Sequence, residues 1–314
     1  CDELINNNLS AVIKNKTGLL IDPYFSASKI NWILKNIEDA KQLAFNNKLA
    51  VGTIDCFILY KLTNGESFYT DATNASRTSL YNINTCKWDN ELLEVYDIPI
   101  SILPEVKNNI DNFGYSNSKI LGEKLPINAM IGDQQSAAIG QICVNPGDIK
   151  ATFGTGCFVL LNTGKKALNS KNKLITTIAL KSENEISYAL EGSIFVSGAT
   201  MKWLKDELKI ISDVRETQSL AASIKDNNGV YFVPAFTGLG APHWRADARG
   251  TITGLTSSSG IAEIVRSSLE AVAYQCCDLF DSMKADGQIP EILRVDGAMS
   301  SNDWLMQFLS DISQ

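Results

Sequence analysis

Histidine is almost absent from this sequence, since only His243 occurs among 314 residues. A mechanism that needs a histidine base or several histidine ligands is therefore nearly excluded, and acid–base chemistry falls to carboxylates. There is also no run of lysine and arginine, and the formal net charge is −7, which argues against binding to nucleic acid or to a membrane surface. No apolar run approaches the ~20 residues that a bilayer-spanning helix needs.

The cysteines form no recognisable ligand set, because they are odd in number, scattered, and without the close spacing of a zinc site. They are Cys1, Cys56, Cys86, Cys143, Cys157, Cys276 and Cys277. Reduced thiols in a cytoplasmic protein are the simplest interpretation. The length, with 45% apolar and 20% charged residues, is ordinary for a soluble globular protein and allows two domains.

The chain opens on Cys1 rather than on methionine and continues directly into a predicted polar helix over 1–16. We therefore expect the sequence to be a fragment of a longer protein. A second helix is predicted from about Ser28, because isoleucine and leucine recur at helical spacing over 30–37. A third is predicted over 88–95.

A carboxylate lies at a predicted strand-to-helix corner near the middle of the chain. The apolar run 129–131 stops at Gly132, and Asp133 and Gln134 then open a small-residue helix that continues to Gln141. An acidic residue in this position is often only a helix cap. It can equally accept the proton of a bound hydroxyl.

Two glycines flank a threonine between the strand-like runs 149–153 and 158–161. The turn Gly154-Thr155-Gly156 can bend tightly and expose backbone N–H groups with a hydroxyl between them, a combination that suits phosphate. Ordinary hairpin turns share this composition. A proton acceptor and a phosphate cradle this close in sequence indicate phosphoryl transfer to a hydroxyl.

Strands alternate with helices through the chain, which favours an α/β architecture. The last pair, a strand over 291–298 and a helix over 302–312, has a glycine turn between its members and is typical of nucleotide sites as well as of ordinary turns. The small polar run 71–78 predicts an ordered loop, not a core segment, held by side-chain hydrogen bonds. The glycine- and proline-rich run 234–244 predicts either a fixed loop over a cleft or a connector between domains.

Seven of these segments, taken in order, resemble motifs of the FGGY carbohydrate kinases and, within that family, of the members that phosphorylate glycerol. They are IDPYF (21–25), TDATNASRT (70–78), GDQQ (132–135), FGTGCF (153–158), YALEG (188–192), PAFTGLGAPHW (234–244) and RVDG (294–297). Each motif alone is weakly specific, whereas seven in family order are highly specific. The resemblance runs from Cys1 to Gln314.

The resemblance implies an α/β fold of the actin-like (ribonuclease H-like) ATPase type, with two domains and an incomplete N-terminal domain. Residues 1–141 would be the remainder of the N-terminal substrate domain, and 142–314 the C-terminal nucleotide domain, incomplete at its end. ATP and substrate would bind between them. The implied reaction transfers the γ-phosphate of ATP, with Mg²⁺, to a terminal hydroxyl of glycerol. No nucleic-acid or membrane partner is expected, and a homo-oligomer is left open.

The family's site residues map onto this sequence position by position. Asp133 matches the catalytic base. The substrate contacts would be Tyr24, Asp133, Gln134 and Phe158. The nucleotide contacts would be Gly154, Thr155, Gly156, Gly198, Lys202, Gly297, Ala298 and Asn302. No residue of the chain matches a metal ligand.

Two nucleotide positions depart from the family pattern. Lys202 stands where the glycerol-phosphorylating members often have glutamine, and Ala298 where the family usually has glycine. Ala298 either brings a Cβ toward the nucleoside or costs about 1–2 kcal/mol if the turn needs a left-handed residue.

The first phosphate hairpin of the family and other glycerol contacts would precede Cys1, so we expect the separate chain to be unstable or inactive. A kinase for another sugar or polyol and a non-catalytic remnant of a kinase are the alternatives.

Overall fold

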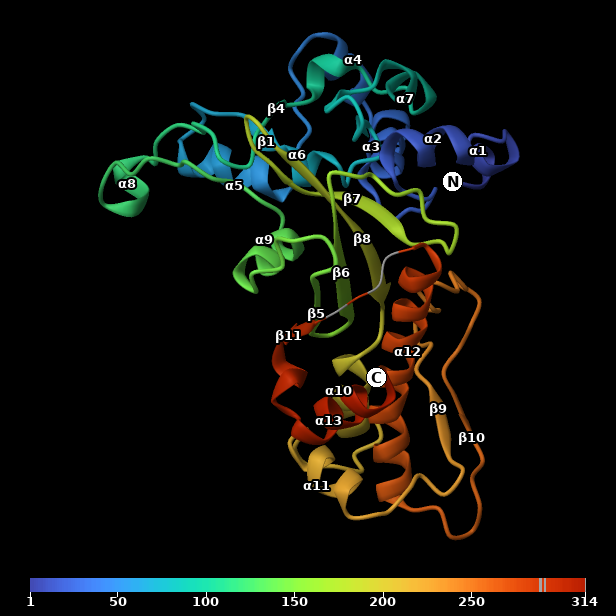
Figure 1. Ribbon diagram of the computed structural model, residues 1–314. Coiled ribbons are helices and arrows are strands. Elements are labelled where there is room, and N and C mark those ends of the chain that lie inside the picture. The colour runs from blue at the N-terminus through green and yellow to red at the C-terminus, as the bar shows by residue number, and fades with distance from the viewer. Residues whose placement is uncertain (288–289, 291, 314) are drawn as a thin grey trace. The chain divides into compact units, whose positions relative to one another are not determined.

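The computed structural model describes residues 1–287, 290 and 292–313, and the chain divides into two compact units (Figure 1). The first unit comprises Cys1–Ser136, Asn162–Asn169 and Ile175–Ala189, and the second comprises Ala137–Leu161, Ser170–Leu174 and Leu190–Gln314. The first crossing between units therefore lies a few residues before the predicted boundary at Gln141, and the chain crosses again further on. Glu291, with which the last predicted strand begins, and Gln314 lie outside the described residues.

The first unit is built from short helices and short strands. Its helices are α1 (Asp2–Asn6), α2 (Ser10–Thr17), α3 (Ser26–Asn36), α4 (Ala40–Phe45), α5 (Ile54–Leu62), α6 (Ala72–Ala75), α7 (Asn90–Val95) and α8 (Ser118–Leu121). Its strands are β1 (Tyr69–Asp71), β2 (Tyr81–Asn82), β3 (Lys87–Trp88), β4 (Glu105–Lys107) and β7 (Ile175–Lys181). β1 pairs with β4 in parallel, and β2 pairs with β3 antiparallel.

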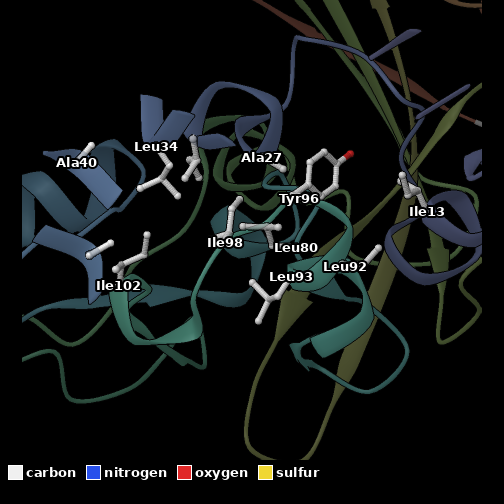
Figure 2. Close-up of a cluster of buried hydrophobic side chains, with 12 residues drawn as sticks. Ile13, Ala27, Leu34, Ala40, Leu80, Leu92, Leu93, Tyr96, Ile98 and Ile102 are labelled. Carbon is white, nitrogen blue, oxygen red and sulfur yellow. The ribbon is translucent and has the colours of Figure 1, made fainter. Parts of the chain in front are cut away.

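A buried apolar cluster holds the helices of this unit together (Figure 2). Its members include residues from α2, α3, α4 and α7, namely Ile13, Ala27, Ile30, Leu34, Ala40, Ala44, Leu92 and Leu93, with Leu80, Tyr96, Ile98 and Ile102 from the connecting segments. The predicted helix near residue 28 is confirmed as α3, but Ile33 and Ile37 are exposed. Only part of the expected apolar face is therefore buried.

Two helix predictions in this unit need correction. The single helix predicted over 1–16 is two helices, interrupted before Ser10, and Asn8 there has φ 59°, a left-handed conformation that asparagine tolerates. The helix predicted from Trp88 begins only at Asn90, because Trp88 belongs to β3 and Asp89 is the N-cap of α7.

The polar run 71–78 is not a surface loop, contrary to the prediction. Asp71, Thr73 and Ser76 are fully buried, and the run forms the end of β1 and the helix α6. The predicted side-chain hydrogen bonds are present: the Asp71 carboxylate accepts the N–H groups of Thr73 and Asn74, and the Ser76 hydroxyl donates to the Thr73 carbonyl at 2.7 Å. Polar side chains can enter a core when each has a partner.

The second unit contains longer helices and most of the sheet. Its elements are α10 (Gly198–Asp206), α11 (Glu216–Ala222), α12 (Ile261–Ala285), α13 (Asp303–Ser313), β5 (Ile149–Phe153), β9 (Tyr231–Val233), β10 (Thr251–Thr253) and β11 (Leu293–Asp296). The helix α9 (Asp133–Gly140) and the strands β6 (Cys157–Gly164) and β8 (Ile186–Ile194) each run from one unit into the other. The sheet order is β11-β5-β6-β8-β7.

α12 is the main support of the second unit. It packs against α11, α13 and β9, which lie beside it in Figure 1. Its apolar stripe is buried along most of its 25 residues. Among the described residues, no helix combines the length and apolar character needed to cross a bilayer.

Asp89 offers a test of the first unit's electrostatics. Its carboxylate caps α7 and accepts hydrogen bonds from Lys16 at 2.7 Å and Asn82 at 2.8 Å. Burial raises the pKa of Asp89, but these hydrogen bonds outweigh burial and hold the pKa below its ordinary value. Asp89→Ala should lower the free energy of unfolding at pH 7 by about 1–2 kcal/mol.

The sign of the pH dependence follows from the lowered pKa. The stabilisation is fully present above the unfolded-state value of about 3.9 and is lost as pH falls through the lower folded-state value. Urea unfolding at several pH values should therefore show the two proteins converging in acid. Glu185→Ala removes a carboxylate from an exposed pair with Lys165 and should change stability little at any pH. A gap between wild type and Asp89→Ala that persists unchanged in acid would contradict this account.

Candidate active site

A cavity of ≈ 1150 Å³ opens in the second unit. It is lined by the β5–β6 turn, by α10, by α11 and its flanks, and by the segment that follows β11. Most of the residues predicted to contact the nucleotide line it, namely Gly154, Thr155, Gly198, Lys202, Ala298 and Asn302. The structure therefore brings together residues from widely separated parts of the sequence.

The β5–β6 hairpin has the predicted form. Its strands pair antiparallel with Phe153 opposite Cys157, which leaves Gly154, Thr155 and Gly156 as the turn. Thr155 is exposed at the cavity. The N–H of Gly154 donates to the Gly156 carbonyl at 2.8 Å, so this N–H is occupied inside the turn and, contrary to expectation, is not free for a ligand.

The start of α10 is bonded to this turn. The N–H groups of Ser197 and Ala199 donate to the Thr155 carbonyl, and that of Gly198 donates to the Gly154 carbonyl at 3.0 Å. A Cβ at Gly198 would lie 2.5 Å from the Gly154 carbonyl oxygen. Only glycine therefore lets α10 approach the hairpin this closely.

Gly297 and Gly156 do not line the cavity; they allow neighbouring backbone to pack closely against the turn. Gly297 has φ 89°, and a Cβ there would lie 2.4 Å from the Phe153 carbonyl oxygen. A Cβ at Gly156 would lie 2.5 Å from the Ile194 carbonyl oxygen. Both glycines permit close backbone contact, so their role in shaping the site is indirect.

Ala298 causes no backbone strain. It begins a 3₁₀ turn, Ala298–Ser301, and its φ is not in the left-handed region, which Gly297 occupies instead. Of the two alternatives for this position, the strain cost is therefore wrong. The Ala298 residue is exposed and lines the cavity.

Asn302 lines the cavity but is engaged by the protein at both ends of its amide. Its oxygen accepts the Leu305 N–H at 3.0 Å and so caps α13, and its nitrogen donates to the Thr217 hydroxyl at 3.2 Å. This side chain ties α13 to α11. Lys202, one turn into α10, is exposed beside the cavity.

The sequence reasoning missed the α11 wall of the cavity. The additional lining residues include Trp203, Asp206, Arg215, Thr217, Gln218 and Met299. A sequence signal was available, because Asp213 followed three residues later by Glu216 fits a helix-start pattern; the Glu216 carboxylate accepts the Asp213 N–H at 3.0 Å, although the N-cap of α11 is Arg215. The helix is too short for its apolar spacing to have marked it.

The Arg266 guanidinium fixes α12 to α11. It forms a buried ion pair with Glu270, one turn further along α12, at 2.8 Å, and it also donates to the Ala221 carbonyl in α11 and to the Ile224 carbonyl just after that helix. The same guanidinium lies over the Trp304 ring at 5.0 Å. Removing one partner of such a pair would leave a buried charge uncompensated, so this wall of the cavity is firmly held.

The run 234–244 lies wholly within the second unit, so its interpretation as a connector between domains is wrong. Phe236, from this run, packs on Trp203 of α10 with ring centroids 5.0 Å apart, and Phe232 of β9 stacks on the same indole. The Trp244 indole donates to the Lys173 carbonyl at 2.8 Å. The two phenylalanine contacts with Trp203 support α10 from the side.

Asp133 lies in the first unit, at the start of α9, as predicted. It is exposed, and its Oδ1 accepts the N–H of Gln134 at 2.7 Å. The strand predicted before it is wrong: Ala129 makes only an isolated bridge with Ile110. The segment before Asp133 is held by irregular backbone bonds to 109–114, such as that from the Met130 N–H to the Asn109 carbonyl at 2.9 Å, and by the Thr73 hydroxyl, which accepts the Gly132 N–H at 2.9 Å.

The other predicted substrate residues are distributed over both units. Gln134 follows Asp133 and is half-buried, and Tyr24 is half-exposed with its ring edge-to-face with Phe25 at 5.3 Å. Phe158 is half-buried on β6, in the part of that strand that belongs to the second unit.

Comparison with known proteins bears on these observations. The model of the N-terminal domain of the FGGY family of carbohydrate kinases matches residues 1–140, and the model of the C-terminal domain matches 149–314. The glycerol kinase of Coxiella burnetii is 52% identical over 313 residues, 99% of this chain and 62% of that protein. Glycerol kinase 1 of Pseudomonas aeruginosa is 52% identical over 312 residues, 99% of this chain and 63% of that protein.

Solved structures agree with the α/β two-domain fold that the motifs implied. The structure of Plasmodium falciparum glycerol kinase with ADP matches with a TM-score of 0.90 at 41% identity, covering 99% of this chain and 63% of that chain. A ligand-bound xylulose kinase from Lactobacillus acidophilus matches with a TM-score of 0.84 at 22% identity, covering 99% of this chain and 63% of that chain, which bears on the fold alone. The chain thus spans a little under two thirds of the length of the relatives it matches. On both domain models, this chain belongs to the FGGY family of carbohydrate kinases.

Proposed function

We propose that the protein containing this chain transfers the γ-phosphate of ATP to a terminal hydroxyl of glycerol, giving glycerol 3-phosphate and ADP. The observation that carries the proposal is the cavity onto which the glycine-flanked Thr155 and the start of α10 both open. The 52% identity to glycerol kinases over 99% of the chain supports the choice of substrate. Free thiols at all seven cysteines support a cytoplasmic setting.

ATP would bind in the second-unit cavity. Thr155 would contact the phosphates through its exposed hydroxyl. Gly198 and Ala298 would lie against the nucleoside, and Lys202 would add a positive charge near the anion. The glycines at 156 and 297 would act indirectly, by allowing the backbone contacts that shape the turn.

Mg²⁺ would arrive with the nucleotide, since Mg²⁺ in kinases is held by one or two carboxylates together with substrate phosphates and water. In the part of the chain that the structure describes, no group of three or more histidine, cysteine, aspartate or glutamate side chains is arranged to hold a metal ion. The ion's contribution would be charge neutralisation on the phosphates.

Asp133 would act as the general base. As the glycerol oxygen forms its bond to the γ-phosphorus, the hydroxyl proton passes to the Asp133 carboxylate, and the bond from the γ-phosphorus to the bridging oxygen breaks to release ADP. Gln134 and Tyr24 would orient the substrate hydroxyls, and Phe158 would contact its carbon chain.

Two alternatives are less well supported. Among the solved structures compared, a xylulose kinase is 22% identical to this chain and a glycerol kinase 41%, which disfavours a pentulose substrate. A non-catalytic remnant gains no support from backbone strain at Ala298, which is not in the left-handed conformation. Neither alternative has a specific feature of the described residues in its favour.

A substrate panel tests the proposal. The complete gene product that includes this chain should phosphorylate glycerol with a kcat/KM at least roughly tenfold above that for xylulose or gluconate, because a site shaped for three carbons discriminates by buried contacts. ADP release coupled to a reporter reaction provides the rate. Preference for xylulose would replace the substrate assignment, and no turnover together with no ATP binding would support the remnant.

A further inference from the structure

The buried carboxylate of Asp71 is the centre of a hydrogen-bond network in the first unit. Its Oδ1 accepts the Thr73 N–H at 2.7 Å, the Thr73 hydroxyl, and the Asn109 amide at 2.7 Å. Its Oδ2 accepts the Asn74 amide at 2.5 Å. Burial raises the pKa of Asp71, and the hydrogen bonds from Thr73 and Asn74 oppose that rise. Such convergence of donors on one carboxylate fixes the geometry of the surrounding chain.

The Thr73 hydroxyl connects this carboxylate to the segment before Asp133. A hydroxyl has one proton, and in Thr73 it is donated to the Asp71 carboxylate. The Thr73 oxygen is then available as an acceptor, and the N–H of Gly132 donates to it at 2.9 Å. The backbone position of Gly132 is therefore set by a side chain 59 residues away in sequence.

Asn109 makes a second connection to the same segment. Its amide nitrogen, which donates to Asp71, also donates to the Met130 carbonyl at 3.0 Å, and its own backbone carbonyl accepts the Met130 N–H at 2.9 Å. Its amide oxygen accepts the Lys181 N–H of β7 at 2.7 Å. Met130 lies three residues before Asp133, and Gly132 lies one residue before it. Both are anchored to Asp71, Met130 through Asn109 and Gly132 through Thr73.

A third connection holds the first turn of α9. The Gln135 amide donates to the Thr177 hydroxyl of β7 at 3.4 Å, and Thr177 lies 3.2 Å from the Ser76 hydroxyl of the same polar run. A Cβ at Gly132 would lie 2.7 Å from the Gln135 amide oxygen, so any larger residue before Asp133 would displace that amide. The polar run 71–78 thus bonds directly to Gly132, just before Asp133, and indirectly, through Thr177, to Gln135 after it.

We propose that Asp71, Thr73 and Asn109 are positioning residues that fix the proposed base, Asp133, through the backbone of Gly132. The assignment rests on the proposed function, because it gives the network a catalytic purpose. Asp133 itself is exposed, and its recorded hydrogen bond among the described residues is to the adjacent Gln134 N–H. Its placement therefore depends on the backbone that precedes it.

Thr73→Val tests the network, because valine keeps the shape of threonine and removes the hydroxyl. We expect kcat for glycerol phosphorylation to fall about tenfold with KM for ATP nearly unchanged, since a displaced base slows the chemical step alone. The exchange rate of the Gly132 amide hydrogen, followed by hydrogen–deuterium exchange, should rise by a similar factor. Thr73→Ser restores the hydroxyl and should return both values toward those of wild type.

Thr78→Val is the matched control, because Thr78 is buried in the same run and its hydroxyl donates to the Ala75 carbonyl at 2.7 Å. It should lower stability without changing Gly132 exchange or the ratio of kcat to KM. If Thr73→Val fails to fold, hydrogen–deuterium exchange of the wild-type protein still tests the network. The Gly132 and Thr73 amide hydrogens should then exchange at the same slow rate, because both belong to this network. Fast Gly132 exchange in wild type, or equal effects of Thr73→Val and Thr78→Val, would overturn the inference.

These outcomes separate the inference from the proposed function. If the Gly132 amide of the wild-type protein exchanges slowly but the protein does not phosphorylate glycerol, the proposed function is refuted. The hydrogen-bond network then remains as structure, without a role in positioning a base. A protein that phosphorylates glycerol while Thr73→Val leaves kcat unchanged refutes the positioning role alone.

Discussion

Asp133→Asn should lower turnover of glycerol by a factor of about 10²–10⁴, the usual contribution of a general base. Asparagine has nearly the same shape and can still accept the Gln134 N–H, so the start of α9 should be preserved. The amide cannot take up the proton that leaves the substrate hydroxyl. Glycerol and ATP binding, measured by calorimetry on the complete gene product, should stay within a few-fold of wild type, because these contacts are formed before the proton moves.

Asp39→Asn is the control for this substitution. Asp39 is an exposed aspartate in the same unit, it caps no helix through its side chain, and its φ of 65° is one that asparagine also adopts. This variant should be indistinguishable from wild type. Near-normal turnover in Asp133→Asn would remove Asp133 from the base role, and lost substrate binding would indicate a structural role instead.

Gly198→Ala should weaken ATP binding by up to about 100-fold, because one methyl group disrupts the contact between α10 and the phosphate hairpin. The new Cβ would lie 2.5 Å from the Gly154 carbonyl oxygen and 3.3 Å from the Met299 sulfur, and the first of these is backbone that cannot rotate away. The hairpin must therefore shift, and Thr155 shifts with it. Titration with ATP and Mg²⁺, followed by calorimetry, measures the loss.

Gly140→Ala is the matched control in the second unit. Apart from its chain neighbours and the helix's own backbone, no atom of the described residues lies within 4 Å of a Cβ added at this helical glycine, so the extra methyl group should leave nucleotide affinity unchanged and can raise helix stability by up to about 1 kcal/mol. Equal ATP affinity in Gly198→Ala and wild type would show that the hairpin–α10 contact does not shape the nucleotide site.

Elements defined by local pattern were predictable from the sequence. The glycine-flanked turn between two apolar runs gave the β5–β6 hairpin correctly, and regular apolar spacing over 30–37 located α3. Each of these depends on neighbours within a few residues, so propensity and spacing carry the information. Thr155, in the predicted turn, lines one cavity with Gly198, which the family resemblance had indicated.

The buried polar run was not predictable in this way. Thr73 and Ser76 are in the core because their hydroxyls meet Gly132 and Thr177, partners that lie far away in sequence. A local reading of polar composition assigns such residues to the surface. The strand wrongly expected before Asp133 has a related cause, because irregular backbone bonds to 109–114 and the distant Thr73 hydroxyl hold that segment in place of a regular strand ladder.

For individual site residues, the position in the cavity was predictable, but the role of the side chain was not. Asn302 was expected to contact the nucleotide, and it lines the cavity, but its amide is engaged by Thr217 and by the start of α13. Ala298 was considered as a possible source of strain, and the left-handed position proved to be Gly297. Sequence located the segment in both cases, whereas the function of each side chain depended on contacts across the unit.

The most direct test of the account is a crystal structure of the complete gene product with glycerol and a non-hydrolysable ATP analogue. The account predicts a terminal hydroxyl of glycerol within hydrogen-bond reach of the Asp133 carboxylate, about 2.6–3.2 Å, and the γ-phosphate of the analogue against the Gly154–Gly156 turn. Glycerol bound with its hydroxyls on another base, or a nucleotide bound away from Thr155, would contradict it.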